Sequence, residues 1–361
     1  MTMQLPNLAS HDIGRRPPMA KASQSRSEWI AELLQASSRT FALTIPMLPE
    51  PLRDQVGLAY LILRSADGIE DGTQVASEKR LELLARFSEA LAQKPQDDRF
   101  FEDCRDFATH LPQGGERDVV ASTQRLLETL EAFPAPHQAA IRKHCIRVVD
   151  RMGGWIAASS GGDGQRLKDL GELSDYMYSV AGIVGELLTD LFVLHNPRAP
   201  RLQLMARAAD FGAGLQLTNI IRDAAEDAAM DRHFLPTEFF FVGSENGTTQ
   251  LQALADLARL RLATAVDYTC GLPEEESGVR LFCLAPVVLA LSTLEALMIR
   301  APEAIAGERI SIDRLALDTA DAKVTVASFW GAKADWPFIV PPTDWTLPES
   351  QSTKLPPNSG E

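Results

Sequence analysis

The chain has 361 residues, of which 45% are hydrophobic and 23% are charged, and it carries a formal net charge of -14. This is an ordinary globular mixture, long enough for one large domain or two smaller ones. The acidic balance argues against nucleic-acid binding and against a polybasic membrane patch. The four cysteines and six histidines lack CxxC or HExxH spacing, which argues against a zinc site and favours reduced, packed thiols.

The predicted elements, taken in chain order, are almost entirely helical. Residues 1–26 are polar, contain Pro17 and Pro18, and are expected to be disordered, and the Pro- and Ser-rich residues 336–361 are expected to form a loose tail. No long alternating strand pattern occurs, so we predict one all-α domain over 27–335, with helices around a central cavity. Apolar spacing predicts helices from Trp29 onward and over 52–70, 77–93 with Ser77 as N-cap, 100–110, 119–133, 138–159, 173–194, 202–229, 249–270 and 278–299.

The longest apolar run extends from Leu281 to Ile299. Its length would permit a membrane span. Because Pro286 and Glu295 lie inside it, we interpret it as a buried core helix instead. Near the N-terminus, Arg15-Arg16 is followed by no apolar run, which argues against a secretory signal.

The most informative stretch runs from Gln216 to Asp227. On a helix, Gln216, Asn219, Asp223 and Asp227 share one face. Asp223 and Asp227 are four residues apart, and like charges at that spacing cost a few tenths of a kcal/mol. A cation would offset this cost, and Mg²⁺ is usually bound by one or two carboxylates together with substrate phosphates.

An upstream stretch repeats this pattern, since Tyr60, Arg64, Asp67 and Asp71 also share a helical face. A single acidic pair is usually a solvated helix surface. Two pairs, each on an apolar helix and each preceded closely by an arginine, predict two acidic faces directed at one metal-bridged polyanion.

Five ordered blocks resemble the squalene/phytoene synthase family of head-to-head prenyl transferases, over roughly residues 30–300. The resemblance implies an all-α isoprenoid-synthase fold, Mg²⁺, and two allylic diphosphates, here farnesyl diphosphate, joined through a cyclopropyl intermediate. The second and last blocks look more like squalene synthases, which implies NADPH reduction as well. The blocks are Ser38 to Phe41, Tyr60 to Asp71, Tyr176 to Gly185, Gln216 to Asp227 with Arg232 to Pro236, and Phe282 to Pro286.

The resemblance implies that metal ions neutralise the departing diphosphate. For Glu70, ligation and a role as surface neighbour both stay open. Arginines are candidates to clamp diphosphate oxygens, with pairing to nearby aspartates as the alternative. The implied metal ligands are Asp67, Glu70, Asp71, Asn219, Asp223 and Asp227. The implied diphosphate contacts are Arg39, Arg64, Arg222, Arg232 and Ser38, and the NADPH contacts are Arg39, Arg64, Arg222 and Arg314.

Tyr176 matches the family tyrosine that stabilises a cation or relays a proton, and the alternative is a hydroxyl that only satisfies a backbone group. A catalytic role is also considered for Tyr60 and Arg64. Tyr178 is a weaker candidate, and Gln216 is expected to hydrogen-bond near the metal face. A water-free cavity would be lined by Phe41, Leu187, Leu191, Leu215, Phe282 and Leu284, each of which could instead be ordinary core.

The sequence departs from the family pattern at two places. Gly68 stands where a larger residue is usual, without removing any acidic side chain. Around Ile310 to Arg314 the expected basic stretch is interrupted by Asp313, which weakens the prediction of NADPH use.

Alternatives are therefore a phytoene- or dehydrosqualene-type synthase without reduction, a presqualene diphosphate synthase, and an inactive helical assembly factor. Because the product is insoluble and no anchor is found, we expect a cytoplasmic protein with transient, peripheral bilayer contact.

Overall fold

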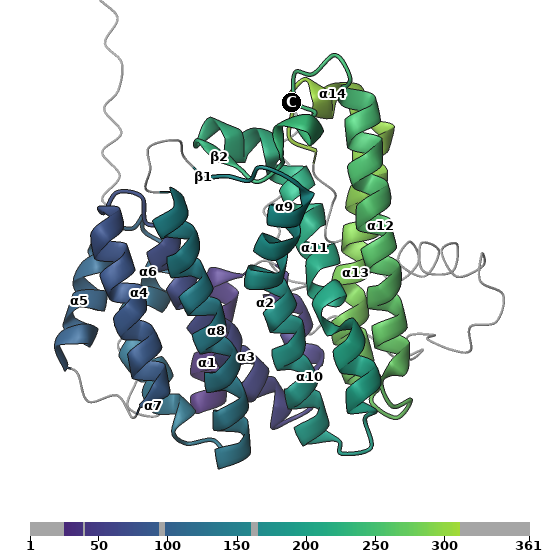
Figure 1. Ribbon diagram of the computed structural model, residues 1–361. Helices are drawn as coiled ribbons and strands as arrows, with labels where there is room; N and C mark the ends of the chain where they lie inside the picture. The colour runs from purple at the N-terminus through teal and green to yellow at the C-terminus, as the bar shows by residue number, and fades with distance from the viewer. Residues whose placement is uncertain (1–24, 39, 94–97, 160–164, 311–361) are drawn as a thin grey trace, which may run out of the picture.

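A computed structural model describes residues 25–38, 40–93, 98–159 and 165–310, which form a bundle of helices (Figure 1). The described residues do not include Arg39, Arg314, the stretch 161–164 or the predicted tail 336–361. The same is true of residues 1–24 within the predicted N-terminal segment. Helix α1 begins at Arg26, slightly before the predicted boundary, because the Ser25 side chain and Glu28 form a capping box.

The first half of the bundle surrounds α3 (Leu52–Asp71), whose apolar face is buried along its whole length. Helices α1, α4 and α6 to α8 contact α3 directly, and α5 packs against α4, α6 and α7. The other elements of this half are α1 (Arg26–Ser37), α2 (Phe41–Thr44), the 3-10 helix η1 (Ile45–Met47), α4 (Ser77–Ala92), α5 (Asp98–Thr109), α6 (Gly115–Ala121), α7 (Thr123–Leu130) and α8 (Ala135–Ser159).

The second half is organised by α11 (Arg201–Ala229), which packs against α10, α12 and α13. A short parallel pair joins the halves, with residue 165 of β1 opposite Arg232 of β2 and Arg166 opposite His233. The other elements are β1 (Gln165–Arg166), α9 (Leu170–Met177), the π-helix η2 (Tyr178–Gly182), α10 (Ile183–His195), β2 (Arg232–His233), the 3-10 helix η3 (Thr237–Phe239), α12 (Gly247–Gly271), α13 (Ser277–Ile299) and α14 (Ala301–Ile305).

Small residues bring α10 and η2 into backbone contact with α11. A Cβ on Gly185 would lie 1.9 Å from the carbonyl oxygen of Ala208, and one on Gly212 would lie 2.1 Å from that of Ala181. Any side chain at these two glycines would therefore push α10 and η2 away from α11.

The structure corrects four local predictions. Ser77 is the first residue of α4 rather than its N-cap, which is Ala76. The helix predicted over 119–133 is two helices, because the Ser122 and Thr123 hydroxyls donate to backbone carbonyls of α6 and the chain turns there. The helix predicted over 173–194 contains the π-helix, and the two-residue strands were not foreseen.

Two helical stretches are long and apolar enough to cross a membrane, Leu170–His195 and Ser277–Ile299. The structure packs both inside the bundle, and α13 contacts α11 and α12 and buries Phe282, Cys283 and Leu294. This is the arrangement expected for a core helix at 281–299.

Candidate active site

A cavity of about 500 Å³ lies between the two halves of the bundle. Its walls come from α3, α8, η2, α10, α11 and α13, with Arg232 and Phe234 at and after β2. Both acidic motifs reach this one cavity. The remainder of the wall is mainly apolar, with Leu63, Met152 and Leu188 among its residues.

The first acidic motif occupies the C-terminal half of α3. Tyr60, Arg64, Asp67, Glu70 and Asp71 all line the cavity, which confirms the predicted common face and places Glu70 there as well. Arg64 forms an ion pair with Asp67, and its second terminal nitrogen lies 3.3 Å from Glu116 Oε1 on α6.

The second motif lies on α11, where Gln216, Asn219, Asp223 and Asp227 line the cavity as their spacing predicts. Arg222 is not part of the lining. It is bound to Asp223 through two nitrogens, with Nε 2.7 Å from Oδ1, so in this structure the ion-pair alternative for Arg222 is realised.

Arg232 connects the two motifs directly. Its Nη1 donates to Asp71 Oδ1 at 2.9 Å, and its Nη2 donates to Asp227 Oδ1 at 3.0 Å. One guanidinium therefore spans from α3 to α11, which requires the two acidic faces to oppose each other across the cavity. Arg232 Nε is buried and has no hydrogen-bond partner among the described residues, so a donor is left for another oxygen.

Burial, together with the charges of neighbouring carboxylates, raises the pKa of several acids at this end of the cavity. Burial, followed by the charges of Asp67 and Asp71, raises the pKa of Glu70 to about 8. Desolvation at the cavity wall and the Asp67 charge raise the pKa of Asp71, and burial raises that of Asp227 against the lowering effect of Arg232. Binding of a cation beside these carboxyl groups would favour their ionised form.

These residues fit a hard divalent cation in the chemistry of their donors, which are carboxylate and amide oxygens. Within the described ranges, however, no three acidic, imidazole or thiolate side chains gather closely enough to hold one ion. Each acidic face thus offers a partial ligand set, and oxygens of a bound diphosphate would have to complete it.

Tyr176 lies close to the first motif, with its ring enclosed by aromatic neighbours. It stacks on Phe234 with ring centroids 4.8 Å apart and meets the edge of Trp155 at 5.5 Å. Burial, and next the charge of Glu70, raise the pKa of Tyr176 well above its usual value. The phenol therefore stays protonated, beside the carboxylates and at the cavity surface.

The remaining predicted residues divide into two groups. Phe41, Leu187, Leu215 and Phe282 line the cavity, and Phe41 packs on Tyr60 with centroids 5.1 Å apart. For Leu191 and Leu284 the alternative of ordinary core is realised, because both are buried and neither lines the cavity. Leu191 is fully buried between helices one turn beyond Leu187, and Leu284 lies two residues from Phe282 and so on another helical face.

Ser38 and Tyr178 also lie away from the cavity lining. The Ser38 hydroxyl oxygen accepts a hydrogen bond from the Phe41 N–H at 3.0 Å. It also lies beside Tyr60, whose pKa burial raises and Ser38 partly lowers. The Tyr178 hydroxyl contacts Arg147 and Glu186, which are not cavity residues.

Several site residues were missed by sequence reasoning. Glu116 comes from another helix and has no local signal, and Trp155 follows a Gly-Gly pair on α8 that suggests nothing about a site. Phe234 could have been found, because it lies two residues after Arg232 in one of the recognised blocks.

The structure describes part of the predicted NADPH contacts. Of the four arginines predicted to meet NADPH, only Arg64 and Arg222 are described, and each is paired with an aspartate of the acidic motifs.

A helical bundle around a cavity, with acidic motifs on two opposed helices, defines a protein of the isoprenoid-synthase class. The sequence model of the squalene/phytoene synthase family matches residues 34–316. The chain belongs to the squalene/phytoene synthase family.

Curated relatives of the chain are squalene synthases. The protein from Saccharomyces cerevisiae is 30% identical over 299 residues, which are 78% of this chain and 64% of that protein. The human protein is 29% identical over 298 residues, which are 78% of this chain and 67% of that protein. The chain thus spans slightly less than two thirds of the yeast relative's length.

Solved structures show the same fold. A ligand complex of TcSQS superposes with a TM-score of 0.69 at 23% identity, covering 84% of this chain and 90% of that one. A dehydrosqualene synthase in complex with a ligand superposes with a TM-score of 0.53 at 18% identity, covering 86% and 96%.

Proposed function

We propose that the protein condenses two molecules of farnesyl diphosphate head to head, through presqualene diphosphate, to squalene, with Mg²⁺ required and NADPH consumed in the second half-reaction. The observation that carries the proposal is the Arg232 bridge between Asp71 and Asp227. This contact supports the proposal because it joins the two acidic motifs at one end of the cavity. The names of the relatives favour squalene over the other products of the family.

The apolar wall would bind the farnesyl chains. The cavity has a volume of about 500 Å³, which lies in the range of small-molecule pockets. Burying one farnesyl chain supplies on the order of 10 kcal/mol before binding costs, at about 0.8 kcal/mol per carbon. This binding energy holds the two reacting ends near each other and keeps water away from a carbocation.

The acidic end would bind the diphosphates. When bound at Asp67, Glu70, Asp71, Asn219, Asp223 and Asp227, Mg²⁺ supplies Lewis-acid stabilisation of the leaving group. Arg232 Nε has no hydrogen-bond partner in the part of the chain that the structure describes, and it would donate to a diphosphate oxygen. Arg64 would exchange its aspartate partner for such an oxygen.

Tyr176 would act at the carbocation. Its phenol is held protonated, so it presents either a hydroxyl proton or the ring face to the developing positive charge. Phe234 and Trp155 fix its ring orientation. Tyr60 lies one helical turn before Arg64 on the same wall and stays a second candidate for this role.

The proposal is tested by incubating purified protein with farnesyl diphosphate and Mg²⁺, with and without NADPH, and identifying the lipid. We expect squalene with NADPH and presqualene diphosphate without it. A C30 hydrocarbon formed equally well without NADPH would indicate a dehydrosqualene-type synthase. No coupled product under either condition would overturn the proposal.

Because the product is a lipid, we also expect a cytoplasmic protein that meets the bilayer transiently.

A further inference from the structure

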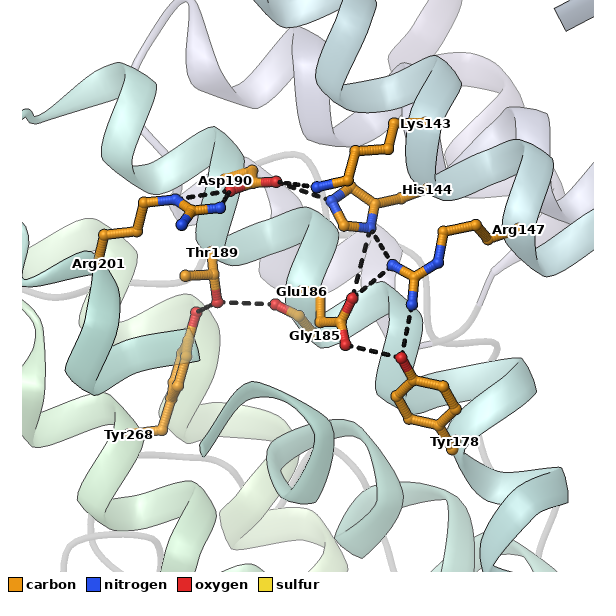
Figure 2. Close-up of polar contacts among 10 residues, drawn as sticks. All are labelled: Lys143, His144, Arg147, Tyr178, Gly185, Glu186, Thr189, Asp190, Arg201 and Tyr268. Carbon is orange, nitrogen blue, oxygen red and sulfur yellow. Dashed lines mark hydrogen bonds and ion pairs between the residues drawn. The ribbon is translucent and has the colours of Figure 1, made fainter. Parts of the chain in front are cut away.

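A second polar cluster lies on the outer side of the cavity wall, between α8 and α10 (Figure 2). Glu186 and Asp190, one turn apart on α10, face bases of α8. Asp190 accepts from Lys143 at 3.3 Å, from His144 Nε2 at 2.8 Å and from Arg201 of α11 at 2.8 and 3.1 Å. Burial raises the pKa of Asp190, but these hydrogen bonds outweigh it and lower the pKa to about 2.

The other half of the cluster is a closed triangle of Tyr178, Arg147 and Glu186. The Tyr178 hydroxyl donates to Glu186 Oε1 at 2.9 Å and accepts from Arg147 Nη2 at 2.5 Å. Arg147 Nη1 donates to Glu186 Oε2 at 2.5 Å and to His144 Nδ1 at 3.1 Å. Because Arg147 can only donate, His144 accepts at Nδ1 and donates from Nε2 to Asp190, which links the two halves.

The triangle holds the π-helix that follows Tyr176. Tyr178 is the first residue of η2, and its ring covers Gly182, the last one, where an added Cβ would lie 2.7 Å from Tyr178 Cδ2. Residues two apart lie on opposite sides of a helix, so Tyr178 lies away from the cavity while Tyr176 faces it. Tying the Tyr178 hydroxyl to α8 and α10 therefore sets the direction of Tyr176, two residues earlier.

Residues next to the triangle in the chain line the cavity, which links the triangle to the cavity wall. Arg147 is adjacent to Val148, and Glu186 lies between Gly185 and Leu187, all three of which line the cavity. Stability alone does not explain the Arg147–Glu186 pair, since these side chains are 35% and 18% exposed and ion pairs near the surface contribute little to the free energy of folding. Hydrogen bonds of defined direction do determine the register of α8 and α10.

We propose that Tyr178 is a positioning residue, whose hydroxyl, held by Arg147 and Glu186, fixes the π-turn and so aims Tyr176 at the acidic end of the cavity. The expected effect on kcat rests on the proposed function, whereas the expected effect on the orientation of Tyr176 does not. Among the described residues, Tyr178 is not part of the cavity lining.

The first experiment removes a single oxygen. In the full-length protein, Tyr178→Phe is expected to lower kcat by about tenfold to a hundredfold, while KM for farnesyl diphosphate changes by less than about twofold. The share of product released as presqualene diphosphate should rise, because Tyr176 is misdirected after the substrates have bound. A purely structural role would lower the amount of folded enzyme without changing this share.

The matched control is Tyr268→Phe. Tyr268 lies on α12, and its hydroxyl is 2.8 Å from the hydroxyl of Thr189 on α10, so this variant removes the same atom from a tyrosine that also contacts α10 but is not part of η2. We expect kcat and the product share to remain at parent values. Equal kinetic losses in Tyr178→Phe and Tyr268→Phe would overturn the proposal.

A readout without turnover separates the inference from the proposed function. With 3-fluorotyrosine incorporated in place of Tyr176, the ¹⁹F resonance should shift or broaden in the Tyr178→Phe background and stay unchanged in Tyr268→Phe. Glu186→Gln keeps an acceptor oxygen for the Tyr178 hydroxyl and should retain the parent resonance, whereas Glu186→Leu should not. If the resonance is unchanged in Tyr178→Phe, the inference is overturned, even if the enzyme is active. If the parent protein forms no coupled product, only the proposed function is overturned.

Discussion

The bridge formed by Arg232 allows a quantitative test of how the two acidic motifs are held together. The variant Arg232→Met keeps the length of the side chain and removes its charge and donors. Its contact with Asp227 is largely shielded, since that carboxylate is 15% exposed, and a hydrogen bond to a charged group is worth about 1.5–3 kcal/mol. The contact with Asp71, which is 45% exposed, adds only about 0–1 kcal/mol.

We therefore expect Arg232→Met to lower the free energy of unfolding by about 2–3 kcal/mol in the presence of EDTA. For a chain of this size the loss corresponds to roughly 3–5 °C in Tm. Addition of millimolar Mg²⁺ should narrow the difference, because a bound cation replaces the lost positive charge between the motifs. Thermal melts followed by circular dichroism, with EDTA and with Mg²⁺, measure both effects.

The control variant is Arg309→Met, which also breaks an ion pair with α11. Arg309 lies 2.8 Å from Glu226, and both side chains are nearly half exposed, so the expected loss is about 0–1 kcal/mol and independent of Mg²⁺. If Arg232→Met melts like the parent in EDTA, or loses no more than Arg309→Met, the bridge does not hold the motifs together and the reasoning fails.

Three further predictions concern the acidic end of the cavity. Asp67→Asn and Asp223→Asn should each lower turnover by at least about a thousandfold with Tm nearly unchanged, and a variant that unfolds instead would show the carboxylate to be structural. Tyr176→Phe should lower kcat by about a hundredfold with KM for farnesyl diphosphate nearly constant, and parent-like kinetics would exclude the hydroxyl from the reaction. The third concerns pH: the pKa of Glu70 is raised on folding to about 8, so its neutral form favours the folded state. In EDTA, stability should thus be lost as pH rises from about 4.5 through 8, and Glu70→Gln should melt with a flatter pH profile; identical profiles would contradict the raised pKa.

Much of the fold was predictable because its signals are local. Apolar residues at helical spacing predicted α3, α8, α11, α12 and α13 to within a few residues of their ends. The same periodicity placed Asp67 with Asp71, and Asp223 with Asp227, on common faces, and the structure confirms both faces at the cavity. The close approach of α10 to α11 was also predictable, because only glycine leaves room for it.

Other features depend on partners that are remote in sequence. The break at Ser122 depends on hydroxyls that bond to the backbone, and Thr123 also meets Ser65 of α3 at 2.7 Å. Glu116 reaches Arg64 only because a glycine at position 68 lets α6 approach: a Cβ there would lie 2.7 Å from a methyl group of Val120. This gives Gly68, which departs from the family pattern, a packing role in this chain.

The sequence by itself determined the helical class and which acidic side chains share a face, because both follow from a repeat of 3.6 residues along one helix. The tertiary structure decided that the two faces meet at one cavity, that Arg232 joins them, and that Tyr178 turns away from the cavity while Tyr176 faces it. These facts depend on packing between helices far apart in the chain, where backbone contacts and hydrogen-bond partners select one arrangement among several that the same periodicity allows.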